Sequence, residues 1–98
     1  MRYADSVIIG FRHKGLEAFY KTGTIRGVQA AHAEKLRRIL TLLDVAACPE
    51  DIYLPSFKLH QLKGELKGHW SIWVNGNLRV TFRFAGDNVE LVDYLDYH

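Results

Sequence analysis

Residues 69–84 read HWSIWVNGNLRVTFRF, and two runs of alternating apolar residues within them decide the fold. Alternation with a period of two predicts β-strands that bury one face. The intervening NGN, residues 75–77, is a hairpin signal. A three-residue loop with Asn77 in the left-handed conformation keeps apolar residues together, whereas a two-residue loop at 75–76 mixes the faces. The predicted apolar pairs are Val74 with Leu78, Ile72 with Val80, and Trp70 with Phe82.

A second hairpin follows along the chain. A four-residue loop over residues 85–88 again sets apolar residues side by side, and it brings Arg83 opposite Glu90 as an attractive cross-strand pair. The predicted pairs are Phe84 with Val89, Phe82 with Leu91, Arg83 with Glu90, and Arg79 with Tyr94. In this register the face of the sheet away from the core is lined by Trp73, Arg79, Thr81, Arg83 and Tyr94.

A first strand and two helices are expected before the sheet. The short β-branched segment 7–12 predicts the strand. Helical spacing of apolar residues predicts one helix that ends at Gly23 and a longer one over residues 29–46. The stripe of the longer helix is His32, Leu36, Ile39, Leu43 and Ala46. We therefore predict a single α+β domain, residues 1–98, with two N-terminal helices packed on a mainly antiparallel four- to five-stranded sheet.

The composition limits the partners and the chemistry. The formal net charge is only +2, so a case for nucleic acid depends on where the charges lie. The single cysteine, Cys48, cannot form an internal disulfide, and no cysteine or histidine spacing typical of a metal site is present. No apolar stretch is long enough for a membrane span, and no secretory signal opens the chain. These features predict a reduced, cytoplasmic protein with no membrane association, no metal and no cofactor.

Basic and aromatic residues off the apolar stripes are candidates for binding RNA. On the second helix, Glu34 and Arg38 stand four apart and can pair, so an ordinary solvated face is the alternative there. Trp73 either stacks on a base or covers the sheet. The candidate RNA-binding residues are Lys35, Arg37, Arg38, Trp73, Arg83 and Tyr94.

The stretch FKLHQLKGELKGHW, residues 57–70, and the chain end carry the candidate chemistry. If Phe57 and Leu59 point to the core, Lys58 and His60 lie on the polar face. The candidate catalytic residues are His60, Lys63, Arg79, Asp96, Tyr97 and His98, and with Tyr94 they are expected to meet at one end of the sheet. Acid–base groups beside cations suit metal-independent cleavage of a phosphodiester: a base takes the ribose 2′-hydroxyl proton, cations stabilise the phosphorane, and an acid protonates the 5′-oxygen. His13 and His69 are expected to be solvated.

Three motifs occur in order: FRHKGLEAFYKTG at 11–23, KLHQLKGELKGHWSIWVNGNLRVTFRF at 58–84, and DYLDYH at 93–98. Together they resemble HigB toxins of the RelE/ParE superfamily of toxin–antitoxin systems, from Ile9 to His98. The resemblance implies a RelE-like microdomain that cuts mRNA in the decoding site of the ribosomal small subunit. It also implies a HigA-type helix-turn-helix antitoxin as partner. The functional residues of the family match at His60, Lys63, Arg79, Asp96, Tyr97 and His98.

The chain departs from the family pattern at three places. Gln61 stands where Pro often follows the histidine, Leu78 stands where Trp often precedes the sheet arginine, and residues 1–7 exceed the usual start. None of these removes a candidate catalytic group. Two rivals remain on the same fold: a ParE-like gyrase poison without catalysis, and a degenerate RNA-binding relative that still binds antitoxin. A gyrase poison has no need for the catalytic set gathered on one surface.

Overall fold

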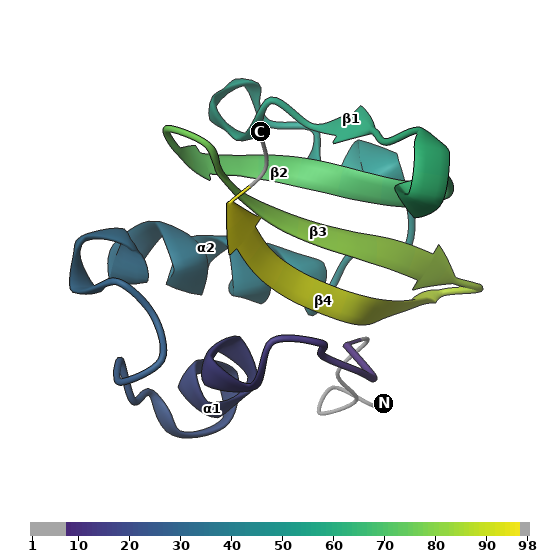
Figure 1. Cartoon of the computed structure of the whole chain (residues 1–98). Coiled ribbons are helices and arrows are strands. Elements are labelled where there is room, and N and C mark those ends of the chain that lie inside the picture. Colours follow the sequence, from purple (N-terminus) through teal and green to yellow (C-terminus); the bar gives the residue numbers. More distant parts are fainter. Residues whose placement is uncertain (1–7, 97–98) are drawn as a thin grey trace.

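The computed structural model describes residues 8–96 and confirms the α+β class. Two helices precede a four-stranded antiparallel sheet in the order β1–β2–β3–β4. Figure 1 shows the sheet in front of α2, with α1 beside β4. Predictions for Val7, Tyr97 and His98 concern positions outside the described residues. The elements are α1 (Lys14–Thr22), α2 (Ala33–Leu43), β1 (His60–Gln61), β2 (His69–Asn75), β3 (Leu78–Ala85) and β4 (Asn88–Asp96), with 3₁₀ turns at Ala30–His32, Pro49–Ile52, Pro55–Phe57 and Gly64–Leu66.

Helix α1 has a defined cap at each end. The backbone N–H of Leu16 donates to Nδ1 of His13 at 2.9 Å, so His13 is the N-cap. His13 is half-buried rather than fully solvated as expected. Gly23 adopts φ 81° and donates its N–H to the carbonyl of Phe19, which ends the helix as predicted. The helix buries Leu16 and Phe19 against the core.

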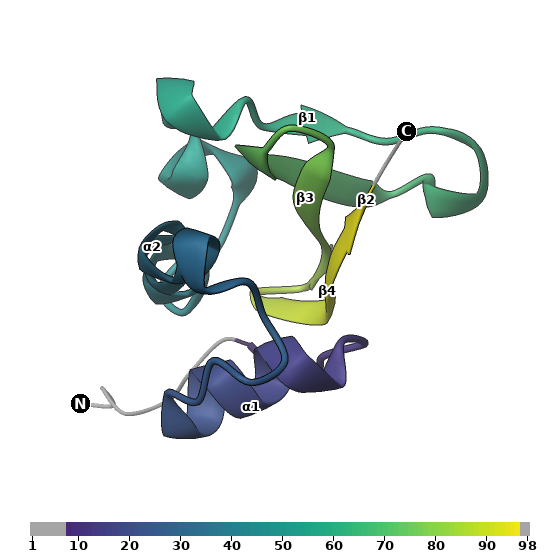
Figure 2. The same ribbon diagram turned by 60° about the vertical axis from the view of Figure 1, so that its left-hand side comes forward.

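Helix α2 carries the predicted apolar stripe into the core. The expected helix over 29–46 is divided into the 3₁₀ turn Ala30–His32 and α2. All five stripe residues are buried: His32, Leu36, Ile39, Leu43 and Ala46. Figure 2 shows α2 lying along one side of the curved sheet, so this stripe meets the apolar residues of the strands.

Two glycines bring α1 against the chain that follows it. A Cβ built on Gly15 would lie 2.6 Å from the carbonyl oxygen of Gly27, which is far inside van der Waals contact. The backbones at Gly15 and Gly27 therefore touch directly, and this contact positions α1 relative to the segment entering α2. Any side chain at either position would push the two segments apart.

The β2–β3 hairpin keeps the predicted apolar pairs away from its turn and differs at the turn itself. Ile72 lies opposite Val80, and Trp70 opposite Phe82, as expected. Near the turn, Leu78 lies opposite Asn75 instead of Val74, because the register shifts between Trp73 and Asn75. The turn is thus Gly76–Asn77, and Gly76 holds the positive φ, 56°, that was expected at Asn77. A bulge, rather than a longer loop, reconciles the short turn with the buried faces.

The β3–β4 hairpin also contains a bulge, and this one changes which residues face the core. Arg83 lies opposite Glu90 as predicted, but a shift between Thr81 and Arg83 moves the register beyond them. Leu91 adopts the left-handed φ of 56° at this point. Consequently Tyr94 lies opposite Val80 instead of Arg79, and it joins the core. The remaining β4 partners are Leu95 for Arg79, Asp96 for Leu78, Asp93 for Thr81 and Val89 for Phe84.

The N-terminal segment adds parallel pairing at the edge of β4. Isolated bridges join Ile8 to Val89 and Phe11 to Val92, so within residues 8–12 the strand expected over 7–12 is present only as bridges. The N–H of Val92 donates to the carbonyl of Gly10 at 3.1 Å. This pairing covers the β4 edge on both sides of the bulge.

Candidate functional site

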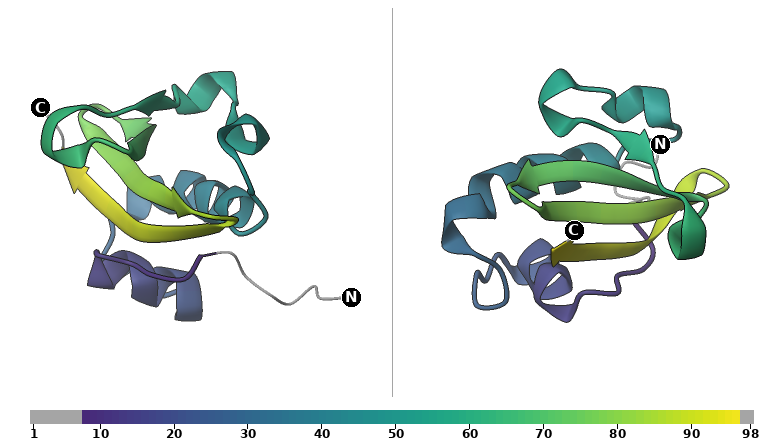
Figure 3. Two further views of the ribbon diagram at one scale, coloured as in Figure 1. Left: turned by 90° about the vertical axis from the view of Figure 1, so that its right-hand side faces the viewer. Right: turned by 45° about the horizontal axis from the view of Figure 1, so that its top comes forward.

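A polar row crosses all four strands on the face of the sheet away from α2. The right-hand view of Figure 3 shows β2, β3 and β4 side by side with α2 beyond them. Ser71 and Thr81 alternate with core residues and so point to this outer face, yet they are 0% and 2% exposed. Pairing across the strands makes the row His60, Ser71, Thr81 and Asp93.

Arg79 is the central cation of the outer face. It lies opposite Trp73 on β2 and Leu95 on β4, in the row next to the polar one. Its Nε and one terminal nitrogen are buried and have no hydrogen-bond partner. Buried N–H donors without partners are costly, and a planar fork of such donors is suited to bind a phosphate. Arg79 therefore has the environment of an anion-binding residue.

Other buried polar atoms on this face also lack partners. His69 is 7% exposed, and neither ring nitrogen is hydrogen-bonded, so its prediction as a solvated residue is wrong. The hydroxyl of Ser71 is likewise buried without a partner. His69 and Ser71 were not among the predicted site residues, although the alternation along β2 places both on the same face as Trp73.

His60 lies on the exposed edge strand β1. Phe57 and Leu59 are buried while Lys58 and His60 are exposed, as predicted. Nδ1 of His60 is 3.2 Å from the carbonyl oxygen of Lys58. Because a carbonyl can only accept, this contact places the proton on Nδ1 and leaves Nε2 of the neutral ring as a proton acceptor. A hollow of about 370 Å³ lined by Tyr53, Gln61 and Trp70 opens beside it.

Lys63 lies in the connection from β1 to β2. This connection surrounds a hollow of about 460 Å³ that is lined by Lys63, Lys67, Gly64 and Gly68 among others. Lys63 is exposed. Its connection lies at the His69 end of β2, whereas Arg79 and Asp96 lie toward the Asn75 end, so Lys63 does not meet them at one end of the sheet as expected. Lys67 was not among the predicted site residues.

The end of β4 pairs with β3 in a different register from the one predicted from the sequence. Asp96 lies opposite Leu78. Because of the bulge at Leu91, Asp96 alternates along its strand in step with Tyr94 and not with the outer-face row of Arg79. Asp96 is exposed and is the last described residue of the strand. Tyr97 and His98 lie outside the described residues. The structure thus brings His60 and Arg79 onto one face. Asp96 lies opposite Leu78, the residue that precedes Arg79 on β3.

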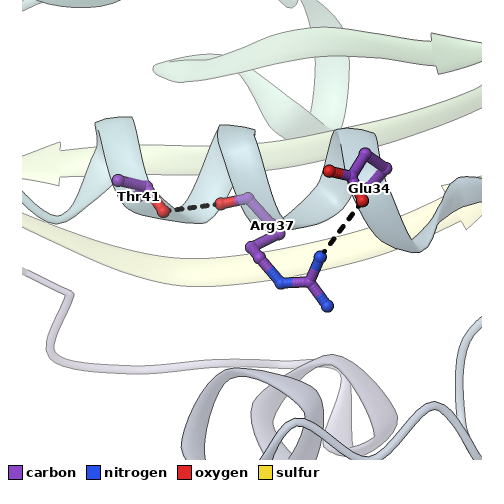
Figure 4. A network of polar contacts seen from close by, with 3 residues as sticks. All are labelled: Glu34, Arg37 and Thr41. Carbon is purple, nitrogen blue, oxygen red and sulfur yellow. Dashed lines mark hydrogen bonds and ion pairs between the residues drawn. The ribbon is translucent and has the colours of Figure 1, made fainter.

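The predicted RNA-binding residues separate into three environments. Lys35 contacts the ring of Trp73, with Nζ 4.3 Å from the ring centroid. Arg37 instead pairs with Glu34 at 3.3 Å and extends over the ring of Phe19, 5.6 Å from its centroid. Figure 4 shows Arg37 bent back toward Glu34, while Thr41 donates to the Arg37 carbonyl. The predicted Glu34–Arg38 pair is therefore replaced by Glu34–Arg37, and Arg38 stays exposed.

Two of the remaining candidates are engaged by the protein itself. Arg83 forms an ion pair with Glu90, the predicted cross-strand partner. Tyr94 is 8% exposed and belongs to the core, so the prediction that it lines the outer face, from which its RNA contact was expected, is wrong. Burial raises the pKa of Tyr94 above its ordinary value, opposed by a backbone hydrogen bond at Gln29. The reason is the bulge at Leu91, which turns Tyr94 toward the helices.

The described part of the chain contains no group of three or more His, Cys, Asp or Glu side chains close enough to hold a metal ion. It also contains no helix long and apolar enough to cross a membrane. Cys48 is a free, half-buried thiol. The groups that can act on a substrate are thus an acid–base histidine on an edge strand and a half-buried guanidinium on the same face. Together these can exchange protons and stabilise a phosphate.

Known proteins are similar to this sequence over nearly its whole length. A family model described as "RelE-like toxin of type II toxin-antitoxin system HigB" matches residues 9–98. The protein named "Endoribonuclease HigB" from Proteus vulgaris is 36% identical over 92 residues, covering 94% of this chain and 100% of its own length. "Toxin HigB-1" from Vibrio cholerae serotype O1 is 37% identical over 90 residues, covering 90% of this chain and 94% of its own.

Solved structures support the fold. The YoeB dimer from Staphylococcus aureus aligns with a TM-score of 0.60 at 16% identity, covering 96% of this chain and 98% of that one. The YoeB/ParE toxin from Agrobacterium tumefaciens aligns with a TM-score of 0.59 at 19% identity, covering 93% and 96%. At such low identity the likeness concerns the arrangement of helices and strands alone.

Proposed function

This chain belongs to the HigB family of RelE-like toxins of type II toxin–antitoxin systems, and on that basis we propose that it is an endoribonuclease that cuts mRNA on the ribosome. The activity is carried by one toxin domain, residues 1–98, without a cofactor. Its relative from Proteus vulgaris bears the name of an endoribonuclease and matches along its whole length, which supports the activity.

The observation that carries the proposal is the guanidinium of Arg79, which has two buried nitrogens without a partner and lies on the same face as His60. Arg79 binds the scissile phosphate and stabilises the charge that grows on its oxygens. Lys63, exposed in the connection from β1 to β2, adds a second cation to the surface that binds the RNA. A protein that only bound another protein would gain nothing from leaving these two nitrogens buried and unpaired.

Proton transfers fall to His60 and to the end of the chain. A base removes the ribose 2′-hydroxyl proton as the 2′-oxygen bonds to phosphorus, and an acid protonates the 5′-oxygen as its bond to phosphorus breaks. Nε2 of His60 is suited to the first step, because the Lys58 carbonyl holds the proton on Nδ1. Asp96, Tyr97 and His98 are the candidates for the second step.

The partners follow from the family and from the charge. A type II toxin acts with an antitoxin, and we propose one of the HigA helix-turn-helix type. Lys35, Arg37 and Arg38 on α2, with Trp73 and Arg83 on the sheet, are the proposed RNA contacts. Ribosomes and mRNA place this activity in the cytoplasm.

The rival function is gyrase poisoning of the ParE kind, without catalysis. One similar structure carries both the YoeB and the ParE name, so the fold does not separate the two functions. The unpaired Arg79 nitrogens favour the nuclease, because a poison that acts by binding needs no phosphate site beside a histidine.

Cleavage of a ribosome-programmed mRNA by the purified toxin tests the proposal. We expect new 5′ ends with the wild-type chain and a loss of about 10²–10⁴-fold with His60→Ala, the usual worth of one acid–base group. Cleavage should persist at EDTA concentrations that leave ribosomes intact. Gyrase inhibition without mRNA cuts would instead establish the ParE-like function.

A further inference from the structure

Trp73 is a meeting point of three segments of the chain. Lys35 from α2 and Lys58, which follows the turn Pro55–Phe57, each place Nζ 4.3 Å from the centroid of its ring. The indole Nε1 donates to the carbonyl of Gly76 at 2.9 Å, which holds the ring in one orientation. The ammonium of Lys35 also donates to the Ser56 carbonyl at 3.1 Å. Two ammonium groups are thereby held at one aromatic ring.

These cations lie together without a neutralising carboxylate. Within residues 8–96, Lys35, Lys58 and Arg38 form no ion pair, whereas Arg37 and Arg83 each do. Burial, followed by the charges of Arg38 and Lys58, lowers the pKa of Lys35. The positive groups therefore destabilise one another, and a bound anion would relieve their repulsion.

The backbone at Lys58 points to the same conclusion. Lys58 adopts φ 47° and ψ 48°, the left-handed conformation that favours glycine. Strained residues of this kind persist where the surrounding structure or a function requires them. Here the strained position carries the ammonium group onto Trp73. The sequence predicts that Lys58 lies on the polar face, and the structure pairs it there with Trp73 on β2.

The position of Trp73 relative to Arg79 indicates which anion would fit here. Trp73 lies directly opposite Arg79, and side chains at paired positions of neighbouring strands start about 4.5–5.5 Å apart at Cβ. A strand of RNA that places one phosphate at Arg79 can therefore present its neighbour to Lys35 and Lys58. Since both ammonium groups already occupy the ring of Trp73, a phosphate suits this place better than a stacked base.

We infer that Lys35, Lys58 and Trp73, with Arg38 at the margin, form a second phosphate site for the mRNA strand, next to the phosphate held by Arg79. This set is called the Trp73 cation site below. The identity of the strand rests on the proposed nuclease function. The site would add affinity that does not depend on base sequence, because phosphate contacts fix position rather than read bases.

The test is binding of a dye-labelled, uncleavable 2′-O-methyl RNA by fluorescence anisotropy over a salt series. Lys58→Gly removes the charge and at the same time relieves the left-handed strain, so the variant is expected to be at least as stable as wild type in thermal unfolding. We expect affinity to fall about tenfold at low salt. The slope of log K against log salt should decrease in magnitude by about 0.7, the value for one phosphate contact on a single strand.

Lys21→Gln is the matched control. Lys21 is an exposed lysine of α1 paired with Glu17, so its loss removes the same charge elsewhere and should leave RNA affinity unchanged. Wild-type affinity and salt slope in Lys58→Gly, or no RNA binding by the wild-type chain, would overturn the inference. Unchanged oligonucleotide binding with weakened pelleting on empty ribosomes, or with weakened antitoxin binding, would assign the site to that other partner. Cleavage of ribosome-programmed mRNA by wild type is scored separately, so failure of the nuclease proposal is distinguishable.

Discussion

The hydroxyl oxygen of Tyr94 lies 2.9 Å from Nδ1 of His32, and this contact ties β4 to the turn that leads into α2. The ring of His13, the N-cap of α1, packs edge-on against Tyr94 with centroids 5.4 Å apart. One buried phenol thus joins both helices to the last strand. Its position explains why a residue expected on the RNA-binding face belongs to the core.

Replacing Tyr94 with Phe should destabilise the fold without affecting cleavage. The change removes the partner of a buried His32 nitrogen, which costs about 1–3 kcal/mol in the free energy of unfolding. Urea denaturation measures this value. Tyr53→Phe is the control, since Tyr53 is 71% exposed and its hydroxyl loss should stay within about 0.5 kcal/mol. Lost cleavage at unchanged stability would return Tyr94 to the RNA site.

The stability contributed by Tyr94 should disappear in alkali. Burial raises the pKa of the folded phenol above 10.0, the ordinary value that applies to the unfolded chain. Above that pH the unfolded phenol releases its proton first, so the unfolded state binds fewer protons and is favoured. The stability is fully present below pH 10.0 and is lost as pH rises through the folded pKa. The difference between wild type and Tyr94→Phe in urea should therefore narrow above that pH, and a constant difference would contradict the shift.

Gly15→Ala should destabilise the chain by more than about 2 kcal/mol, because overpacking against a fixed backbone forces the segments apart. The new Cβ would meet the carbonyl of Gly27 at 2.6 Å. Gly10→Ala is the matched control, since its Cβ would lie 3.8 Å from the nearest atom, the amide nitrogen of Leu91. Thermal unfolding compares the two. Equal melting temperatures would show that α1 and the following segment can separate freely.

Arg79→Lys should abolish toxicity in cells although the charge is unchanged. A guanidinium fork can hold two phosphate oxygens, whereas an ammonium is a single point charge that does not reproduce the geometry. Nε and one terminal nitrogen of Arg79 are buried, so the surroundings fit a planar guanidinium better than an ammonium group. Growth after induction, with folding checked by circular dichroism, gives the answer. Full toxicity of the lysine variant would rule out a need for the fork.

Removal of His98 separates a catalytic tail from a structural one. The strand pairing of β4 extends to Asp96, so a chain ending at Tyr97 should remain folded and bind its antitoxin. If His98 takes part in proton transfer, mRNA cleavage should fall by about 10²–10⁴-fold. Primer extension on ribosome-programmed mRNA compares the truncated chain with wild type. Wild-type cleavage by the truncated chain would show that His98 has no catalytic role.

Much of the fold was predictable because its signals are local. The alternation in residues 69–84 predicted β2 and β3, and the helical stripe from His32 to Ala46 predicted the buried side of α2. The spacing of apolar side chains along the chain is enough to predict such strands and helix faces, since it determines which residues share a face. For the same reason His60 and Arg79 could be assigned to the outer face before any contact was known.

Tertiary structure alone decided the register beyond each bulge and the neighbours of each cation. The left-handed Leu91 is followed by the hydrogen bond from Val92 to Gly10, which comes from the far end of the chain, and it turns Tyr94 inward. A one-residue slip of this kind leaves the local period almost intact but exchanges the faces of every later residue. Likewise, Lys35 and Lys58 meet on Trp73 because α2, a turn and β2 pack together. Sequence therefore determined the chemical groups and the faces of regular segments, whereas long-range pairing determined which of those groups stand side by side.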